Sequence, residues 1–156
     1  MHVGLFQPTI ERSEMARVVS SEMLYNDRDG NTYNLADLKG KVIFINFWAT
    51  WCPPCIAEMP SINALYNIHK GKDEVVFLTI DADNDIENSS GFMEKRKLTL
   101  PVYTPAGTIP QQFFTGTLPT TVIINKNGEL VYKHEGAADY ASEKMKGFLE
   151  ELMTTP

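Results

Sequence analysis

The sequence contains few cysteines, less basic than acidic charge, and no long hydrophobic segment. Two cysteines among 156 residues exclude a small domain held together by many disulfides. Fourteen Lys and Arg against twenty Asp and Glu give a net charge of −6, which argues against a nucleic-acid-binding surface. No segment approaches the roughly 18 consecutive apolar residues that a membrane helix requires, so no bilayer span is predicted.

The length and composition are those of one globular domain. A chain of 156 residues with 43% apolar and 10% aromatic residues can bury one core and is too short for two full domains. Residues 1–15 show no hydrophobic period and are predicted to form a loose arm, with a single domain over 16–156. Residues 1–12 contain no signal-peptide pattern. Two interpretations stay open, a cytoplasmic protein and a mature or truncated form of an exported one.

The hydrophobic pattern alternates between strand-length apolar runs and helical periods. Strands buried on both faces are predicted at 41–48 (KVIFINFW) and 74–80 (EVVFLTI), because both runs are nearly continuous in apolar residues. Apolar spacing predicts a helix over 56–68, and Asp139 and Ser142 are expected to cap the last helix. The remaining expected elements are a hairpin of strands 16–25 and 32–35, helices 89–98 and 138–153, a short helix 109–114, and strands 100–103, 119–125 and 130–135. This order predicts an α/β fold with parallel crossovers and an antiparallel end.

Two cysteines, Cys52 and Cys55, are separated by two prolines at the junction between the strand 41–48 and the following helix. Cys52 is expected at the first helical position, with Cys55 one turn later on the same face. Free backbone N–H groups and the helix dipole stabilise a thiolate there, so Cys52 is the predicted nucleophile. Pro53 and Pro54 remove N–H donors and stiffen the first turn. Cys55, expected to lie deeper, would then resolve a mixed disulfide.

Other uses of the cysteine pair are open at this point. A zinc site needs two more ligands, and His2, His69 and His134 lack the spacing of a metal motif. His69 and His134 are expected at the surface or at helix ends. A structural disulfide or inert core thiols would use the same two residues, but so short a loop removes little chain entropy, on the order of 2 kcal/mol. Redox chemistry is therefore favoured. No metal is implied, and no Gly-rich phosphate loop indicates an organic cofactor.

Three segments together resemble the bacterial thioredoxin-like proteins of the TlpA/ResA group, which are extracytoplasmic thiol–disulfide oxidoreductases. The active-site segment is 47–60 (FWATWCPPCIAEMP), and it is preceded by 35–41 (LADLKGK). The third segment, 116–128 (GTLPTTVIINKNG), is similar to the family's cis-proline loop and the hairpin that follows it. The resemblance extends over about 18–152.

The resemblance implies a thioredoxin-like fold, with a central mixed sheet flanked by helices and an added N-terminal β-hairpin. Pro119 would be the cis-proline facing the disulfide, and the backbone of Leu118 would pair with an extended substrate. Taken alone, Pro119 is a proline at the start of a strand. Trp51, Pro53 and Pro54 would support the active site. From the residues alone, Trp51 either packs or forms an apolar docking surface beside the cysteines.

One position departs from ordinary thioredoxin. The buried aspartate beneath the thioredoxin active site falls on Asn46, which cannot accept a proton during turnover. In ResA-like proteins an acid follows the next strand, and Asp81 or Asp83 occupies that place. We expect one of them to tune the proton of Cys55, the alternative being a solvated acidic loop. Glu58 also matches the family segment, and its place on the helix favours a surface carboxylate.

The resemblance implies a protein-disulfide reductase that acts on thiols and disulfides of partner proteins, apocytochrome c among them. An upstream thiol donor would reduce it again. A periplasmic or extracytoplasmic location is implied, with a cytoplasmic one as the alternative. The two prolines do not fix the direction of electron flow, so a disulfide oxidase or isomerase is the second interpretation. A non-catalytic module that holds a metal or haem on its thiols is the third, and the sequence indicates no oligomeric state.

Overall fold

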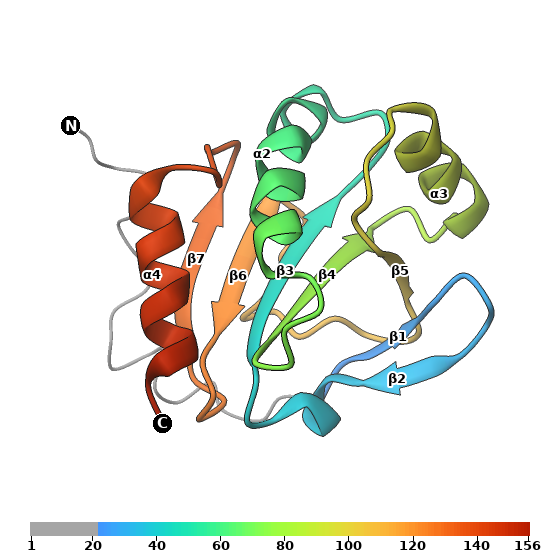
Figure 1. Cartoon of the computed structure of the whole chain (residues 1–156). Coiled ribbons are helices and arrows are strands. Elements are labelled where there is room, and N and C mark those ends of the chain that lie inside the picture. Colours follow the sequence, from blue (N-terminus) through green and yellow to red (C-terminus); the bar gives the residue numbers. More distant parts are fainter. Residues whose placement is uncertain (1–21) are drawn as a thin grey trace.

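The computed structural model describes residues 22–156, and the predicted loose arm over 1–15 lies outside this range. The described chain forms one mixed sheet with helices packed on it (Figure 1). Its strands are β1 (Leu24–Asn26), β2 (Thr32–Asn34), β3 (Val42–Trp48), β4 (Val75–Asp81), β5 (Val102–Pro105), β6 (Thr120–Ile124) and β7 (Leu130–Glu135). Its helices are α2 (Pro53–His69), α3 (Ile86–Lys95), α4 (Glu143–Thr154) and the 3₁₀ helix η2 (Leu35–Leu38).

The sheet has the strand order β2-β1-β5-β4-β3-β6-β7. Strands β3, β4 and β5 run parallel and are joined by the crossover helices α2 and α3, whereas β6 and β7 pair antiparallel. Right-handed crossovers that step twice in one direction place both helices on the same face of the sheet. Helix α4 lies beside α2 on that face (Figure 1). The predicted parallel crossovers and antiparallel end are confirmed.

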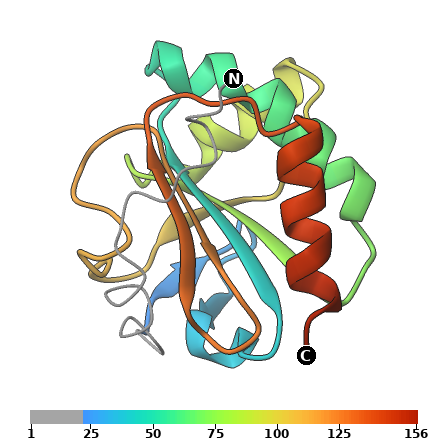
Figure 2. The ribbon, with the colours of Figure 1, turned by 90° about the vertical axis from the view of Figure 1, so that its left-hand side faces the viewer.

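The central strand β3 is buried along its whole length, as its continuous apolar sequence predicts. Alternate side chains of a strand point to opposite faces, so Phe44 and Trp48 lie in the core beneath the helices. Ile45, on the other face, belongs to a second core that includes Phe113. The segment 106–119 lies on the side of the sheet opposite α4 (Figure 2). The loop that follows Trp48 and carries the two cysteines therefore begins at the end of a strand that is packed on both faces.

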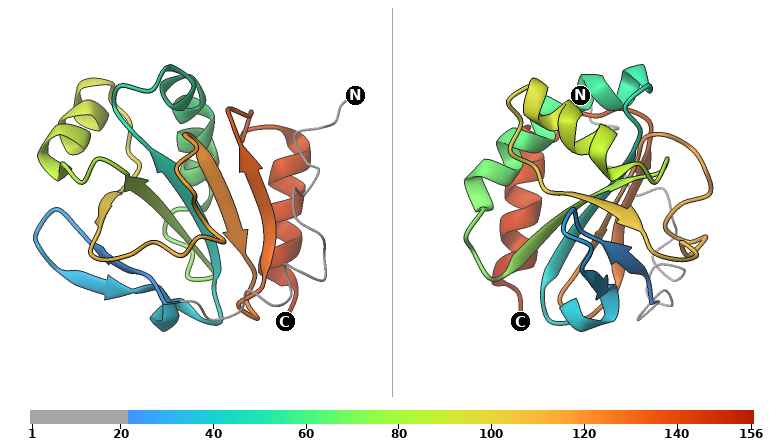
Figure 3. Two further views of the ribbon diagram at one scale, coloured as in Figure 1. Left: turned by 180° about the vertical axis from the view of Figure 1, so that it is seen from behind. Right: turned by 90° about the vertical axis from the view of Figure 1, so that its right-hand side faces the viewer.

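The predicted N-terminal hairpin is present and extends the sheet beyond β5 (Figure 3). Its strands are shorter than the predicted 16–25 and 32–35, and the part before residue 22 lies outside the described residues. The turn is held by Asp27, whose Oδ1 accepts hydrogen bonds from the backbone N–H groups of Asp29 and Asn31, both at 2.9 Å. The dense cluster of Asn, Asp and Gly therefore makes the turn that it predicts.

Side-chain caps determine where the later helices begin. Asp85 caps α3, so this helix begins at Ile86 and not at 89 as predicted. Ser142 caps α4 as predicted, so this helix begins at 143 and not at 138. The prediction that Asp139 also caps α4 is wrong, because its Oδ1 accepts from Ala141 N in a turn that precedes the helix. Hydrophobic periodicity finds the helices, and the caps set their ends.

The predicted short helix over 109–114 is absent, and the segment forms turns. The backbone N–H groups of Phe113 and Phe114 both donate to Pro110 O, at 3.0 and 3.2 Å, which closes one turn that does not continue. Phe113 is buried in the second core. The apolar residues that suggested a helix thus anchor an irregular segment to the sheet.

Candidate redox site

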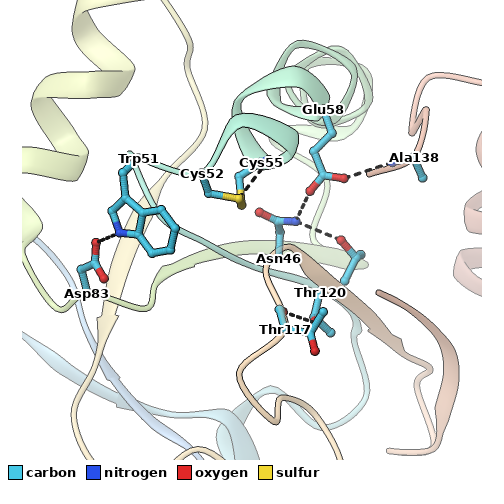
Figure 4. Close-up of a disulfide and its surroundings, with 10 residues drawn as sticks. Asn46, Trp51, Cys52, Cys55, Glu58, Asp83, Thr117, Thr120 and Ala138 are labelled. Carbon is cyan, nitrogen blue, oxygen red and sulfur yellow. Dashed lines mark hydrogen bonds between the residues drawn. A yellow bond between two sulfur atoms is a disulfide. The ribbon is translucent and has the colours of Figure 1, made fainter. Parts of the chain in front are cut away.

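The two cysteines lie where β3 passes into α2. Cys52 is the N-cap of α2, one residue before its predicted position, and Cys55 lies in the first turn. They form a disulfide with a Cα–Cα separation of 5.2 Å (Figure 4). One strand and the helix that follows it are enough to bring the two sulfurs together, as the sequence predicts.

The prolines at the start of α2 leave one backbone donor for the sulfur of Cys52. Pro53 and Pro54 occupy the first two helical positions and have no N–H group. The N–H of Cys55 is therefore the first free donor of the helix, and it donates to Cys52 Sγ at 3.3 Å. This donor and the helix dipole both favour negative charge on the sulfur of Cys52 in the reduced protein.

The two cysteines differ in their burial. Both cysteines belong to the core beneath the helices, where Met59 also packs, but Cys52 keeps 4% of its surface exposed and Cys55 keeps none. Burial among apolar groups disfavours a thiolate on Cys55, whereas the helix start favours one on Cys52. The predicted deeper position of Cys55 is confirmed.

Trp51 lies at the surface beside the cysteines, with 65% of its side chain exposed. Its indole Nε1–H donates to Asp83 Oδ2 at 2.7 Å, which holds the ring against the loop that follows β4 (Figure 4). Of the two interpretations open for Trp51, packing in the core is therefore wrong. The ring presents an apolar face to solvent next to the disulfide.

The two acids expected near Cys55 have different environments. Asp81, the last residue of β4, is buried, and its carboxylate accepts hydrogen bonds from the backbone N–H groups of Asp83 at 2.9 Å and Asp85 at 3.0 Å. Asp83 binds Trp51, as described above. The loop is therefore an ordered structure built on Asp81, and the interpretation as a simply solvated acidic loop is wrong for this residue.

Glu58 is the acid that sequence reasoning placed wrongly. The sequence predicts a surface carboxylate, yet Glu58 is buried. Asn46 Nδ2 donates to its Oε2 at 2.8 Å, and Ala138 N donates to its Oε1 at 3.3 Å. Burial raises the pKa of Glu58 from 4.5 to about 7. The sequence carried a signal: Glu58 follows Cys55 by three residues and precedes the buried Ile62 by four, a spacing that marks one helix face.

Asn46 occupies the middle of β3 and is fully buried beneath α2. Besides the bond to Glu58, its Nδ2 donates to Thr121 Oγ1 on β6 at 2.9 Å. Its Oδ1 is buried and has no hydrogen-bond partner within residues 22–156. Asn46 therefore ties the central strand to the active-site helix through its nitrogen alone.

The peptide bond between Leu118 and Pro119 is cis, the conformation that the resemblance implies. Pro119 O accepts from Gly136 N at 2.8 Å, and Thr120 Oγ1 donates to Thr117 O at 2.6 Å, so this loop is fixed on both sides of the proline. Figure 4 shows the loop below the disulfide, on the side away from α2.

The described residues offer neither a metal cluster nor a membrane helix. Between residues 22 and 156, no three His, Cys, Asp or Glu side chains gather in a way that could hold a metal ion. In the same part of the chain, no helix has the length and apolar character needed to cross a bilayer.

The fold and the site define a class of protein: an α/β domain that carries an asymmetric dithiol/disulfide pair at the start of a helix. Comparisons with known proteins agree. The family model described as Redoxin matches residues 9–148. A ResA thiol–disulfide oxidoreductase of Bacillus cereus is 39% identical over 127 residues, covering 81% of this chain and 72% of the relative. The counterpart in Bacillus anthracis is 37% identical, with the same coverage.

Solved structures show the same architecture. StoA from Bacillus subtilis superposes with a TM-score of 0.67 at 25% identity, covering 84% of this chain and 98% of that one. The exposed lipoprotein thioredoxin of Streptococcus pneumoniae gives a TM-score of 0.63 at 27% identity, covering 85% and 100%. The chain belongs to the redoxin family and, within it, to the thiol–disulfide oxidoreductases of the ResA type, which act on protein thiols and disulfides.

Proposed function

We propose that this protein reduces disulfides in partner proteins, with Cys52 as the attacking thiolate and Cys55 as the resolving thiol. The observation that carries the proposal is the asymmetry of the pair at the start of α2. Cys52 Sγ receives the first free N–H of the helix, and Cys52 keeps 4% of its surface exposed, whereas Cys55 keeps none. A thiolate stabilised at the helix start can attack a partner's disulfide, and the more deeply buried thiol can then resolve the mixed disulfide.

The reaction consists of two exchanges and one return step. Cys52 thiolate attacks one sulfur of the partner's disulfide, the partner's S–S bond breaks, and a mixed disulfide forms while the other partner sulfur leaves as a thiolate. Cys55 then attacks Cys52, so the partner leaves with both sulfurs reduced and the Cys52–Cys55 bond forms. An upstream dithiol donor reduces this bond and is itself oxidised to a disulfide. No further cofactor enters the balance.

Glu58 is proposed as the group that takes the proton of Cys55 before resolution. It lies one helical turn after Cys55 on the buried face of α2, and its raised pKa of about 7 lets it hold or release a proton near neutral pH. Asp81 and Asp83 are the alternative acids for this proton. Their support is their place in the ordered loop that contacts Trp51.

Substrate contact is proposed on two sides of the disulfide. Trp51 offers an exposed apolar ring, and Leu118 precedes the loop proline, with no hydrogen bond to its backbone from any residue between 22 and 156. An extended segment of a partner protein can pair with such a free backbone. Pro53 and Pro54 support the site by keeping the helix start rigid.

The favoured substrates are cysteines of exported proteins, including apocytochrome c before haem attachment. The support is the similarity to ResA and to a protein described as an exposed lipoprotein thioredoxin. A periplasmic or otherwise extracytoplasmic location, with an upstream thiol donor there, is proposed on the support of the same similarity.

Insulin reduction and partner trapping test the proposal. The wild-type protein should accelerate reduction of insulin disulfides by dithiothreitol, Cys52→Ser should abolish the acceleration, and Cys55→Ser should accumulate a mixed disulfide. A reduction potential near −300 mV supports the reductant, whereas one near −120 mV indicates an oxidase. Absence of exchange, together with stoichiometric zinc or a haem absorption band on the purified protein, would instead establish a thiol-binding module.

A further inference from the structure

The side-chain nitrogen of Asn46 is hydrogen-bonded, whereas its side-chain oxygen has no hydrogen-bond partner among residues 22–156. Its Nδ2 donates to Glu58 Oε2 at 2.8 Å and to Thr121 Oγ1 at 2.9 Å. The ionised Glu58 carboxylate can only accept, so it holds the amide with its nitrogen toward Glu58, and the Thr121 hydroxyl accepts from the same nitrogen. Its Oδ1 is buried, with no donor for it among residues 22–156. A buried acceptor without a donor is uncommon in proteins and calls for an explanation.

The free oxygen lies on the active-site side of the amide. Asn46 shares one face of β3 with Phe44 and Trp48, and this face packs against α2. Its nitrogen binds Glu58, one turn after Cys55 along α2. Figure 4 shows the amide beneath the first turn of the helix, with the nitrogen turned toward Glu58 and the oxygen toward the cysteine pair.

The cysteine pair offers this oxygen a donor in only one redox state. A disulfide has no hydrogen to donate, whereas a thiol S–H is a weak donor. The described structure is the oxidised state, in which Asn46 Oδ1 is unpaired. Leaving a buried acceptor unpaired is costly, so a change that supplies a donor is favoured.

We propose that Asn46 Oδ1 accepts a hydrogen bond from the Cys55 thiol in the reduced protein, so that Asn46 stabilises the reduced pair and keeps Cys55 protonated until resolution. The inference rests on the proposed roles of the two cysteines. It assigns to Asn46 a function different from that of a proton acceptor, since an amide gains no proton at any step.

The reductive step balances with the upstream dithiol as reductant. The donor's two S–H groups become a disulfide and give up two electrons and two protons, and the two electrons break the Cys52–Cys55 bond. One proton stays on Cys55 Sγ, where Asn46 Oδ1 accepts its hydrogen bond. The other proton is released to solvent, and Cys52 remains a thiolate.

The first test is spectroscopic and uses the wild-type protein reduced with a phosphine, which has no S–H group. We expect one infrared S–H stretching band, from Cys55, at a lower frequency than a free thiol shows. The band should move to the free-thiol frequency in Asn46→Leu, and a free-thiol frequency in the wild-type protein would overturn the proposal. A second S–H band would refute the ionised Cys52 of the proposed function, while the Cys55 band would still decide the role of Asn46.

The second test measures the reduction equilibrium in glutathione buffers. Asn46→Leu should shift it toward the disulfide by about tenfold, which is about 30 mV for a two-electron couple. Thr121→Val, which removes the other partner of the same amide and leaves Oδ1 in place, should shift it by less than about twofold. An unchanged equilibrium in Asn46→Leu contradicts the proposal.

A double-mutant comparison separates this role from an effect through Glu58. Asn46→Leu should produce the same shift in a Glu58→Gln background as in the wild-type background, because the proposed hydrogen bond does not involve Glu58. A shift that disappears in that background would show that Asn46 acts only by holding the Glu58 carboxylate, and the proposal would be wrong.

Discussion

The indole of Trp51 and the carboxylate of Asp83 are joined by a hydrogen bond of 2.7 Å between Nε1 and Oδ2. Asp83 is itself held by its backbone N–H, which donates to Asp81 Oδ1 at 2.9 Å. A chain of two hydrogen bonds therefore connects the buried end of β4 to the exposed ring beside the disulfide. The ring is oriented by the loop beneath it, although most of its surface faces solvent.

Removing the Asp83 carboxylate should weaken substrate reduction without unfolding the protein. In Asp83→Ala the indole loses its partner, so kcat/KM for a protein disulfide should fall roughly three- to tenfold, the effect of one modest hydrogen bond. Trp51→Phe loses the same bond and keeps a ring. The double variant should be no worse than Trp51→Phe, and additive losses would contradict this coupling.

The buried acid Glu58 should make stability depend on pH. Its pKa is about 7 in the folded protein and 4.5 when unfolded, so the folded state binds the extra proton between these values. The free energy of unfolding should therefore fall as pH rises from about 4.5 to 7, by roughly 3 kcal/mol from this group. Urea unfolding of oxidised Glu58→Gln should lack this decrease. The exposed acid Glu151, changed to Gln, is the control and should keep it.

Titration of the Cys55 thiol should identify the acid coupled to it. We expect Glu58→Gln to move the pKa of Cys55, measured in a Cys52→Ser background by alkylation rate or thiolate absorbance. Asp81→Asn and Asp83→Asn are the matched comparisons in the loop. If either of these moves the titration while Glu58→Gln leaves it in place, the loop acid is the coupled group and Glu58 is not.

Asp81 should matter for stability whatever its role in proton transfer. Its buried carboxylate accepts from the backbone N–H groups of Asp83 and Asp85. In Asp81→Asn an amide N–H₂ group must face one of these donors, which should cost about 1–3 kcal/mol of unfolding free energy. A loss below about 0.5 kcal/mol in denaturant unfolding would show that the loop adapts without this carboxylate.

The cap of the last helix offers a simpler test of the structure. Ser142 Oγ accepts from Met145 N at 3.1 Å, so Ser142→Ala should reduce stability by about 1 kcal/mol. Asp139→Ala removes only a hydrogen bond to Ala141 N in an exposed turn and should cost less. Thermal unfolding of the two variants side by side measures the difference, and equal losses would contradict the assignment of Ser142 as the cap.

The sequence predicts the sheet well where hydrophobic burial dominates. The strand β3 is apolar at nearly every position, and only burial on both faces suits such a run. The position of the cysteine pair is equally predictable, because two cysteines three residues apart directly after a strand lie together at the start of the next helix. The segment 109–114 misleads because Phe113 serves a core on the far face of the sheet, which local periodicity does not reveal.

The site was harder to predict where tertiary contacts override residue type. Glu58 was expected at the surface because carboxylates are rarely buried. Its burial depends on Asn46 of β3 and on the backbone of Ala138, which come from distant parts of the chain. The sequence predicts Cys52 at the first helical position, but Cys52 is the N-cap, because a sulfur can cap a helix as a serine hydroxyl does.

The paired prolines that open α2 have a consequence for small molecules. Helix starts commonly attract phosphates and carboxylates of metabolites, because several amide groups there point outward. Here two of those amides do not exist, and the next one is already engaged by sulfur. A cellular anion therefore has little to bind at this helix start, and the reactive sulfur stays unblocked for a protein substrate.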